Sequence, residues 1–486
     1  MTATTLLRAL PRRAQLTHWL ERIAIPTGVV LVSLVAGAMV TSPQLLRIGF
    51  AGVLAVTVIG LGTRAPRPLL YGLVVWLAAL GMVRRLLSHG FSSGGPADPL
   101  LLVAPFALLI LVMAANERGA FQTRTRLSTA MMALITVIGF GAVNPLQGSL
   151  VAGLTALVFF LPLCAFWVGR GFAEDSTLRR MMLVYAICAV PAAAYGLLQI
   201  SNGFPSWDQE WIERSGYAAL QVGDAVRPFS SFSSASEYAV FLSIAILAWG
   251  ILARRFARPV SIAAIALLSA SVFYQSSRGS VVSLLAAVAL IVAAKRRLSL
   301  GMAITLAVGI LALLPLVAGR FAPATYGTDA KSQLIQHQLE GLANPFDAES
   351  STASAHMSLI VGGIKEGFRQ PLGHGISTIT IAGKKFGGSL VGGTEADASN
   401  AAVAMGLPGL LAFLAVFWIG FGQAYRLARR TQSPMALLAL GVLTVTANQW
   451  LNGGRYAVAF LPWLLLGFVD RRTEDLDASE RAEAAP

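Results

Sequence analysis

Charged residues are scarce in this chain: they make up 12% of its 486 residues, against roughly 25% in soluble domains. Hydrophobic residues account for 56%, so there is too little charge to cover a globular surface in water. The sequence therefore predicts a protein that crosses a membrane many times. The net charge of +14 does not indicate nucleic-acid binding, because the arginines cluster between apolar runs, as membrane topology signals do.

Several other features are missing. The two cysteines, Cys164 and Cys188, both lie in apolar runs, so neither a disulfide framework nor a thiolate metal site is indicated. The glycines near Gly387 and Gly392 lack the strand–turn–helix context and the Lys-Ser/Thr ending of a phosphate loop. Three histidines, His337, His356 and His374, lie about twenty residues apart, which is no metal-ligand spacing. We expect no metal and no cofactor.

The apolar residues form runs near the length of about twenty residues that a membrane-crossing helix needs. They lie near 23–41, 45–62, 68–83, 99–115, 127–143, 149–168, 181–199, 237–253, 259–275, 279–294, 298–317, 400–422, 434–449 and 455–469. Because the stretch 259–294 divides in more than one way, we predict an all-α, polytopic bundle of 12–14 membrane helices.

The distribution of positive charge predicts the orientation of this bundle. Most of the 37 lysines and arginines fall in segments on the side of the N-terminus, and the cytoplasmic side of membrane proteins carries this excess. We therefore expect both termini in the cytoplasm and an uncleaved first helix. The predicted regions are a cytoplasmic segment 1–22, a bundle 23–317 with an outer loop 200–236, a long extracytoplasmic loop 318–399, membrane helices 400–469 and a cytoplasmic tail 470–486. The acidic part of this tail, from Glu474 to Pro486, is expected to be disordered.

The loop 318–399 holds most of the lysines and histidines and ends in Glu395 and Asp397. A connection of this length is usually functional, and we expect it to cover a lipid-bound substrate of an enzyme. Within it, residues 354–368 have apolar positions at helical spacing. They predict either an amphipathic helix on the outer membrane surface or a helix packed within the loop.

Arginines at the outer ends of the apolar runs are the main candidates for binding. Arg278 is the only Asp, Glu, Lys, Arg or His residue in the stretch 261–294, and an arginine beside an apolar run needs a partner or a function. Snorkelling, or pairing with a carboxylate such as Glu237, is the alternative. Arginines share this position at Arg84, Arg85, Arg227, Arg278 and Arg455. Together they predict a cationic pocket for a pyrophosphate, because guanidinium groups bind phosphate oxygens bidentately.

Five short motifs follow one another between about Arg227 and Phe421. They are RPFSSF at 227–232, SSRGS at 276–280, QPLGHG at 370–375, DASN at 397–400 and MGLPGLL at 405–411. In order and spacing around the long loop they resemble the O-antigen ligase and polymerase superfamily of bacterial membrane enzymes. Ligases of that family typically carry a histidine where Ser399 precedes Asn400. This departure favours a polysaccharide polymerase of the exopolysaccharide type.

The resemblance implies a multi-pass enzyme of the bacterial inner membrane. Its donor would be an undecaprenyl-pyrophosphate-linked oligosaccharide and its acceptor a glycan or lipid, with a chain-length regulator and a flippase as partners. It would transfer glycans with inversion and without a metal. The leaving pyrophosphate would be bound by Arg278, Arg227, Arg84, Arg85 and Arg455. Glu395, Asp397 or His374 would be the catalytic base, and Glu237 and Asn400 would support the site.

Other interpretations remain open. A ligase would use the same site with a different acceptor. A transporter or flippase would show internal repeats, broken helices and charges near mid-membrane, and a structural membrane subunit would not need the outer arginines. The carboxylates Glu395 and Asp397 could also form an ordinary loop end or, for Asp397, a helix N-cap.

Overall fold

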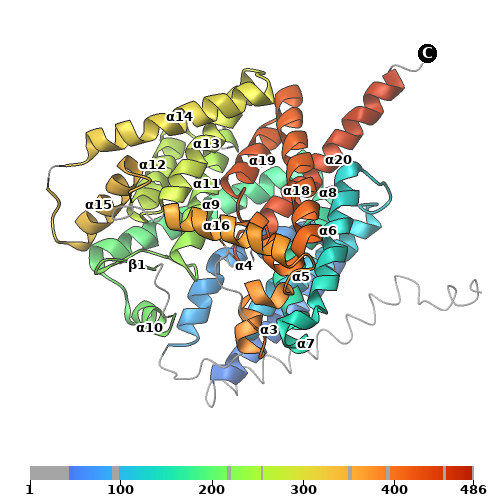
Figure 1. Cartoon of the computed structure of the whole chain (residues 1–486), viewed down its shortest axis with the longest axis horizontal. Helices are drawn as coiled ribbons and strands as arrows, with labels where there is room; N and C mark the ends of the chain where they lie inside the picture. The colour runs from blue at the N-terminus through green and yellow to red at the C-terminus, as the bar shows by residue number, and fades with distance from the viewer. Residues whose placement is uncertain are drawn as a thin grey trace, which may run out of the picture.

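The chain is described by a computed structural model for residues 43–89, 98–215, 220–252, 256–323, 325–347, 353–389, 395–451 and 456–483. The α-helices are α3 (Pro43–Arg64), α4 (Pro66–Leu86), α5 (Val103–Glu117), α6 (Arg126–Ala142), α7 (Leu150–Ala156), α8 (Ala165–Gly171), α9 (Asp175–Asn202), α10 (Ser206–Ser215), α11 (Ala235–Leu252), α12 (Arg258–Tyr274), α13 (Arg278–Lys295), α14 (Leu300–Phe321), α15 (Ala330–Ala343), α16 (Ala353–Arg369), α17 (Ile381–Lys385), α18 (Asp397–Thr431), α19 (Pro434–Val445) and α20 (Phe460–Glu483). Short 3-10 helices are η1 (Pro99–Leu102), η2 (Pro145–Gln147), η3 (Leu157–Cys164) and η6 (Ile376–Ile379). A small antiparallel hairpin pairs β1 (Gln221–Val222) with β2 (Ala225–Val226). The predicted all-α bundle is confirmed (Figure 1).

Among the described residues, nine helices are long and apolar enough to cross a membrane, and three shorter apolar helices, α6, α12 and α19, accompany them. Every predicted apolar run from 45–62 onward coincides with one of these helices, with the segment η1–α5, with α7–η3–α8, or with the first part of α20. The run 23–41 lies outside the described residues. These helices suggest a membrane protein; the kind of membrane and the orientation of the termini stay predictions.

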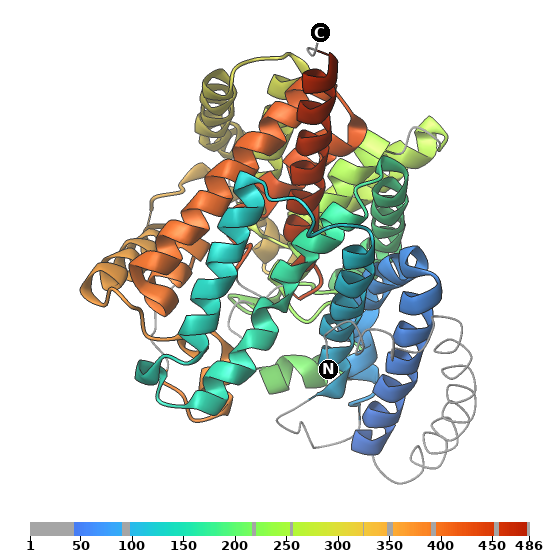
Figure 2. The same cartoon turned by 90° about the vertical axis from the view of Figure 1, so that its right-hand side faces the viewer.

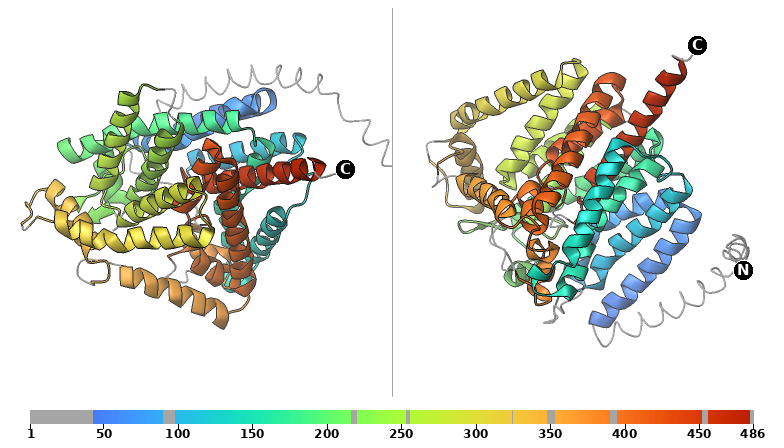
Figure 3. Two further views of the ribbon diagram at one scale, coloured as in Figure 1. Left: turned by 90° about the horizontal axis from the view of Figure 1, so that it is seen from above. Right: turned by 45° about the vertical axis from the view of Figure 1, so that its right-hand side comes forward.

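The centre of the bundle is formed by α11, α19 and the first part of α20. Every residue of α19 from Met435 to Val445 is buried, as is every residue from Phe460 to Asp470. Helices that are apolar on all sides belong inside a bundle. The margins are formed by α3 and α14, of which few residues are buried within the protein. They lie at opposite edges in the right view of Figure 3.

The connections separate to the two ends of the bundle. At one end, the Arg67 guanidinium is 2.5 Å from Glu174 and Arg472 is 3.6 Å from Asp175. At the other end lie α10 and the helices of the long loop, and Figure 2 shows α10 (light green) below and the end of α20 above. The ion pairs of Arg67 and Arg472 thus lie away from α10 and the loop helices, and which of the two ends faces the cytoplasm stays a prediction.

The C-terminal segment corrects one expectation. The tail from Glu474 onward was predicted to be disordered, but α20 continues through Glu483. Its acidic residues form ion pairs. Asp475 lies 3.1 Å from Arg471 of the same helix, and Glu480 pairs with Arg430 of α18. Ion pairs at spacing i,i+4 and between helices stabilise a segment that composition alone marks as disordered.

In the long loop, residues 354–368 were predicted to form either an amphipathic surface helix or a helix packed within the loop, and α16 has features of both. One side packs against the first half of α18, where Gly367 approaches Ala402. The other side leaves Met357, Val361 and Phe368 exposed. In Figure 1, α16 crosses the front of the bundle between α15 and α18.

The loop is attached to the bundle through a break in α18. At Gly406 the backbone has φ 63° and ψ −153°, so the helical hydrogen bonds are interrupted. The backbone N–H groups of His374 and Gly375 donate to the carbonyls of Val403 and Ala404, each at 2.9 Å. A Cβ on Gly406 would lie 1.9 Å from the Pro371 carbonyl oxygen, so only glycine fits. The backbone N–H of Leu407 also donates to the Pro371 carbonyl at 3.0 Å, so the PLGHG and MGLPGLL motifs hydrogen-bond to each other.

Candidate functional site

Two arginines and a histidine meet where α15 covers the start of α13. Arg278 is the first residue of α13, and its Nη2 lies 2.8 Å from Nε2 of His337 on α15. The other ring nitrogen, Nδ1, lies 2.8 Å from Oγ of Ser276. A guanidinium can only donate hydrogen bonds, so Nε2 accepts from Arg278 and Nδ1 carries the proton that it donates to Ser276. The geometry therefore fixes both the tautomer and the orientation of the imidazole.

The third member of this cluster is Arg227, which follows the β1–β2 hairpin. Burial, and then the positive charge of Arg278, lower the pKa of Arg227 to about 10. Burial, followed by the charges of Arg278 and Arg227, lowers the pKa of His337 to about 4. His337 is thus neutral at physiological pH beside two guanidinium groups, which is an arrangement that favours an incoming anion.

Within the described part of the chain, no carboxylate acts on the charge of Arg227, and its buried Nε has no hydrogen-bond partner there. A buried donor without a partner costs free energy, about 1–3 kcal/mol for an ordinary polar group. Phosphate oxygens would satisfy it and would lie between two cations. The Arg227–Arg278–His337 cluster, hereafter the anion site, has the chemistry of a phosphate-binding site.

The absence of a side chain at Gly341 of α15 leaves the space that the Arg278 side chain occupies. A Cβ at this position would lie 1.8 Å from Nη1 of Arg278 and 2.5 Å from its Cδ. The arginine side chain therefore lies flat against the helix that also carries His337. Because the chain turns at Ser276 with φ 58°, a rare conformation for a residue other than glycine, Ser276 and Arg278 both face α15.

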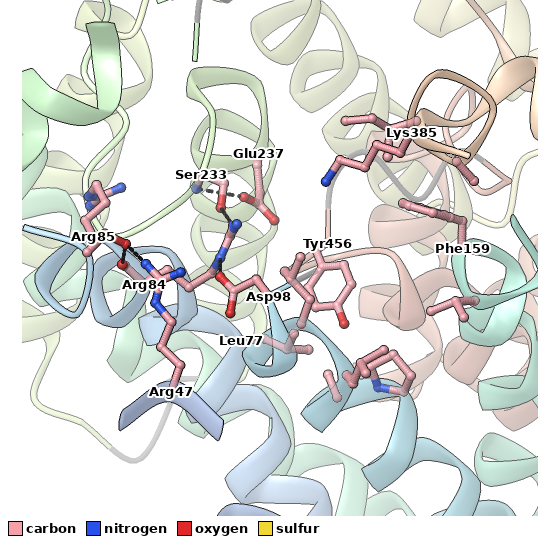
Figure 4. Close-up of a pocket in the computed structure, with 18 of the residues that line it drawn as sticks. Arg47, Leu77, Arg84, Arg85, Asp98, Phe159, Ser233, Glu237, Lys385 and Tyr456 are labelled. Carbon is pink, nitrogen blue, oxygen red and sulfur yellow. Dashed lines mark hydrogen bonds and ion pairs between the residues drawn. The ribbon is translucent and has the colours of Figure 1, made fainter. Parts of the chain in front are cut away.

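A cavity of about 550 Å³ lies at the same end of the bundle, between the membrane helices and the helices α10 and α17. Its apolar wall includes Leu77 of α4, Leu108 of α5 and Phe159 of η3. Charged groups line it from two sides. Figure 4 shows Lys385 extending into this space opposite Arg84, Asp98 and Arg47. The cavity is thus amphipathic.

Several charges of this cavity are already compensated. The Arg84 Nε lies 2.6 Å from Asp98 Oδ2, and its guanidinium lies 5.5 Å from the ring centre of Trp211. Arg214 pairs with Glu210 at 2.9 Å. The Arg47 guanidinium donates to the Ser88 hydroxyl. Arg47 thus differs from Arg84 in that a neutral hydroxyl, not a carboxylate, is its partner.

Arg85, the next residue, is fully buried. Its Nε lies 2.8 Å from Asp208 of α10, and its terminal nitrogens donate to the carbonyls of Ser230 and Phe232. Asp208 also accepts from Tyr195 at 2.6 Å and Gln199 at 2.7 Å. Arg85 therefore holds the segment between β2 and α11 against α4 and α10. It shapes the cavity more than it offers a charge to a ligand.

Glu237 also joins separate segments. Its carboxylate accepts from the backbone N–H groups of Ser233 at 3.1 Å and Ala457 at 2.5 Å. One bond caps the start of α11 and the other fixes the chain before α20. Glu237 lines the cavity, and in Figure 4 it lies beside Ser233.

The predicted bases lie in different surroundings. Glu395 is 40% exposed, with Oε2 3.3 Å from His356 Nδ1. Asp397 is completely buried and accepts from the backbone N–H of Trp450. His374 lies 3.0 Å from Glu366 through its Nε2. Asp397 thus joins the start of α18 to the segment after α19, whereas Glu395 and His374 form polar pairs at the two ends of α16.

Next to Asp397, Ser399 has a helix-capping role. Its hydroxyl accepts from the Ala396 N–H at 3.2 Å and donates to the Ala396 carbonyl at 2.8 Å. Asn400 is buried. Ser399, the position at which the ligases that the motifs resemble typically carry histidine, therefore stabilises the beginning of α18.

The predicted arginines divide into two groups. Arg84 and Arg85 line the cavity, and Arg227 and Arg278 form the anion site; Arg455 lies outside the described residues. Sequence reasoning did not single out His337, Asp208 or Lys385. The signal for Asp208 and Lys385 was only their place in the two outer loops, and His337 is 59 residues from the arginine it contacts.

No group of three or more His, Cys, Asp or Glu residues suited to a metal occurs in the described ranges. No protein-family model matches the chain, and no curated protein sequence is significantly similar to it. The likeness of the five motifs to the O-antigen ligase and polymerase superfamily therefore stays a prediction, and the function is argued from the anion site and the cavity.

Proposed function

We propose that the chain is an integral membrane glycosyltransferase that joins glycans carried on polyprenyl pyrophosphate, and that it acts as a polysaccharide polymerase. The observation that supports this best is the anion site, in which Arg227 and Arg278 flank a neutral His337 under a loop helix. The site lies at the end of a bundle of apolar helices. A substrate with a pyrophosphate between a lipid and a glycan matches this position.

The anion site would stabilise the leaving group. An acceptor hydroxyl attacks the anomeric carbon of the donor glycan, the bond from that carbon to the pyrophosphate oxygen breaks, and the pyrophosphate leaves with the electron pair. Fixed cations at the place where charge develops lower such a barrier. Arg227 and Arg278 fulfil this role, and a single displacement inverts the anomeric carbon.

His337 is the base that the geometry favours. Its Nε2 is unprotonated and accepts a hydrogen bond from Arg278. A bound pyrophosphate would draw the Arg278 guanidinium toward its oxygens, leaving Nε2 available for the acceptor hydroxyl, and its negative charge would raise the pKa of His337. General bases of this kind contribute roughly a hundredfold to ten-thousandfold. Glu395, His374 and Asp397 are the bases implied by the resemblance, and the exposure of Glu395 suits that role better than the burial of Asp397 does.

The break in α18 bears on the transporter alternative, since broken helices commonly form the binding sites of transporters. Here the carbonyls of Val403 and Ala404 at the break accept hydrogen bonds from His374 and Gly375 of the loop. They anchor the loop, so the break favours a covered site over a transport pathway.

The test compares Arg227→Ala and Arg278→Ala with Arg369→Ala, a control on α16 whose side chain is 78% exposed. Each variant is assayed in membranes that contain equal amounts of protein, with a lipid-linked repeat unit as substrate. We expect polymer formation to fall at least about a hundredfold in the first two variants, as for a lost transition-state contact, and to persist in the control. Near-normal polymer from Arg278→Ala would contradict the proposal.

The products separate the two enzyme alternatives. A ladder of increasing chain length indicates a polymerase, whereas one transfer of a finished glycan to another acceptor indicates a ligase. Glu395→Gln and His337→Gln in the same assay distinguish these two of the four candidate bases, because only loss of the true base lowers kcat while donor binding persists.

A further inference from the structure

A serine, a histidine and a glutamate meet at the end of the bundle where α10 lies. His89 follows the end of α4, and Ser206 and Glu210 belong to α10. The Nδ1 atom of His89 lies 2.8 Å from Oε1 of Glu210, and its Nε2 atom lies 3.3 Å from Oγ of Ser206. The three side chains are therefore connected in the order serine, histidine, glutamate, and they are hereafter called the triad.

The direction of these hydrogen bonds follows from the chemistry of the groups. A carboxylate can only accept, so Nδ1 of His89 carries the proton that it donates to Glu210. In the neutral imidazole Nε2 is then the acceptor, and the Ser206 hydroxyl donates to it. A base that is bonded to a hydroxyl and oriented by a carboxylate activates serine as a nucleophile, and this arrangement occurs on unrelated folds.

Neighbouring side chains fix the triad. The second oxygen of Glu210, Oε2, accepts from Arg214 at 2.9 Å, while Oε1 faces His89. The Trp207 ring meets the imidazole in a T-shaped arrangement, with ring centres 6.2 Å apart. Its indole N–H donates to the Tyr195 hydroxyl at 3.2 Å. The imidazole is therefore held by a carboxylate and an aromatic ring that each have another partner.

The start of α10 adds backbone donors beside the Ser206 hydroxyl. The carbonyl of Pro205 accepts the first hydrogen bonds of the helix, from Asp208 at 2.9 Å and Gln209 at 3.0 Å. The N–H groups of Ser206 and Trp207 precede these bonds, so no carbonyl of the helix accepts from them. In serine hydrolases, backbone N–H groups of the nucleophile and of the residue after it stabilise the oxyanion. The start of α10 supplies both.

The surroundings of the triad indicate the class of substrate. Ser206 and His89 are exposed, so water reaches the nucleophile. Such a site suits an ester carried by a polar molecule better than an ester within the lipid phase. Trp207 and Trp211 line the adjoining cavity, and tryptophan combines an apolar face with a polar N–H group. A sugar ring, with its apolar faces and its hydroxyls, matches this combination.

We propose that the triad is a serine esterase site that removes a short acyl group from a sugar. The Ser206 oxygen attacks the ester carbonyl carbon while Nε2 of His89 takes its proton. The bond from this carbon to the sugar oxygen then breaks, and the sugar leaves as a hydroxyl with that proton. Water, activated by the same imidazole, cleaves the acyl-serine and releases a carboxylic acid. Ser206 and His89 are the catalytic residues, and Glu210 positions the imidazole.

The first experiment tests the nucleophile. The purified full-length protein is treated in detergent with a fluorophosphonate, which reacts with activated serines, and the labelled peptide is identified by mass spectrometry. We expect the label on Ser206, no label in Ser206→Ala, and labelling slowed about tenfold or more in His89→Gln. Ser215→Ala, at the other end of α10, is the matched control and should keep the wild-type rate. Labelling that persists in Ser206→Ala overturns the proposal.

The second experiment measures hydrolysis of an acetylated monosaccharide. We expect kcat to fall about a hundredfold or more in Ser206→Ala and His89→Gln. Glu210→Gln should lower kcat at unchanged unfolding temperature, and Glu210→Asp should recover part of the rate. A purely structural role of Glu210 would lower the unfolding temperature of both variants instead. Equal hydrolysis by wild-type protein and Ser206→Ala contradicts the proposal. Hydrolysis of phosphatidylglycerol without hydrolysis of the acetylated sugar would overturn the sugar ester as substrate.

Discussion

Two pairs of arginines have similar places in the sequence but different surroundings in the structure. One pair is Arg84 and Arg85, and the other is Arg227 and Arg278. All four lie at the ends of apolar runs. Arg85 is surrounded by a carboxylate and two carbonyls, and Arg84 by a carboxylate and an aromatic ring. Arg227 faces another guanidinium, and Arg278 donates to a neutral imidazole. The groups around each guanidinium therefore determine whether an arginine stabilises the fold or is placed to bind a ligand.

The largest effect expected from this comparison is on stability, at Arg85. Replacing it with alanine leaves the buried Asp208 without its cationic partner, and breaking a buried pair in this way costs about 3–5 kcal/mol. We expect Arg85→Ala to lower the midpoint of thermal unfolding in detergent strongly, and Arg278→Ala to lower it little. Replacing both partners, in Arg85→Leu with Asp208→Leu, should recover part of the loss. Equal stability of Arg85→Ala and Arg278→Ala would remove the distinction between the two groups.

The second prediction concerns ligand binding at Arg227 and Arg278. A lysine in either position keeps the charge but loses the planar fork that holds two phosphate oxygens. We expect Arg227→Lys and Arg278→Lys to weaken binding of a polyprenyl-pyrophosphate probe about tenfold or more, which corresponds to about 1.4 kcal/mol, at nearly unchanged unfolding temperature. Arg369→Lys is the control. Wild-type affinity in both variants would show that these arginines do not bind phosphate as a fork.

The third prediction moves Arg278 without removing it. In Gly341→Ala the new Cβ would lie 1.8 Å from the Arg278 Nη1, so the guanidinium has to leave its place beside His337. Alanine is the better helix former by about 1 kcal/mol, which offsets part of the strain. We expect about a tenfold loss of probe affinity without a large loss of stability. The matched control is Gly362→Ala on α16, where a Cβ meets nothing within 4 Å; a similar loss there would refute the explanation.

The comparison also shows what the sequence can and cannot predict. Membrane-length helices follow from runs of apolar residues, and the predicted run 68–83 became α4 with bounds only a few residues wider. The partner of Arg85 is 123 residues away in the sequence, at Asp208, and that of Arg278 lies on a loop helix. No local periodicity encodes such contacts. Composition was misleading at 474–483, because ion pairs with α18 and within α20 stabilise a helix that a high charge content disfavours.

The smallest predicted effect is a pH dependence that belongs to the anion site alone. The pKa of His337 is lowered from 6.5 to about 4, so between these values the unfolded chain binds a proton that the folded chain does not. With respect to His337, the free energy of unfolding is therefore highest above about pH 6.5, and it decreases as the pH falls toward 4. An anionic ligand reverses this trend, because it favours the imidazolium and raises the pKa of His337 in the complex.

Ligand binding should then take up a proton, and affinity for the pyrophosphate probe should rise about threefold as the pH falls from about 7 to about 5. His337→Gln, which keeps a hydrogen-bonding side chain without a titrating group, should abolish this dependence while Arg85 and the cavity stay unchanged. The measurement is probe affinity against pH for both proteins. The same slope in His337→Gln would assign the proton to another group and separate His337 from phosphate binding. A flat profile for the wild-type protein would mean that the ligand does not reach the imidazole, and the anion site would then lack its proposed base.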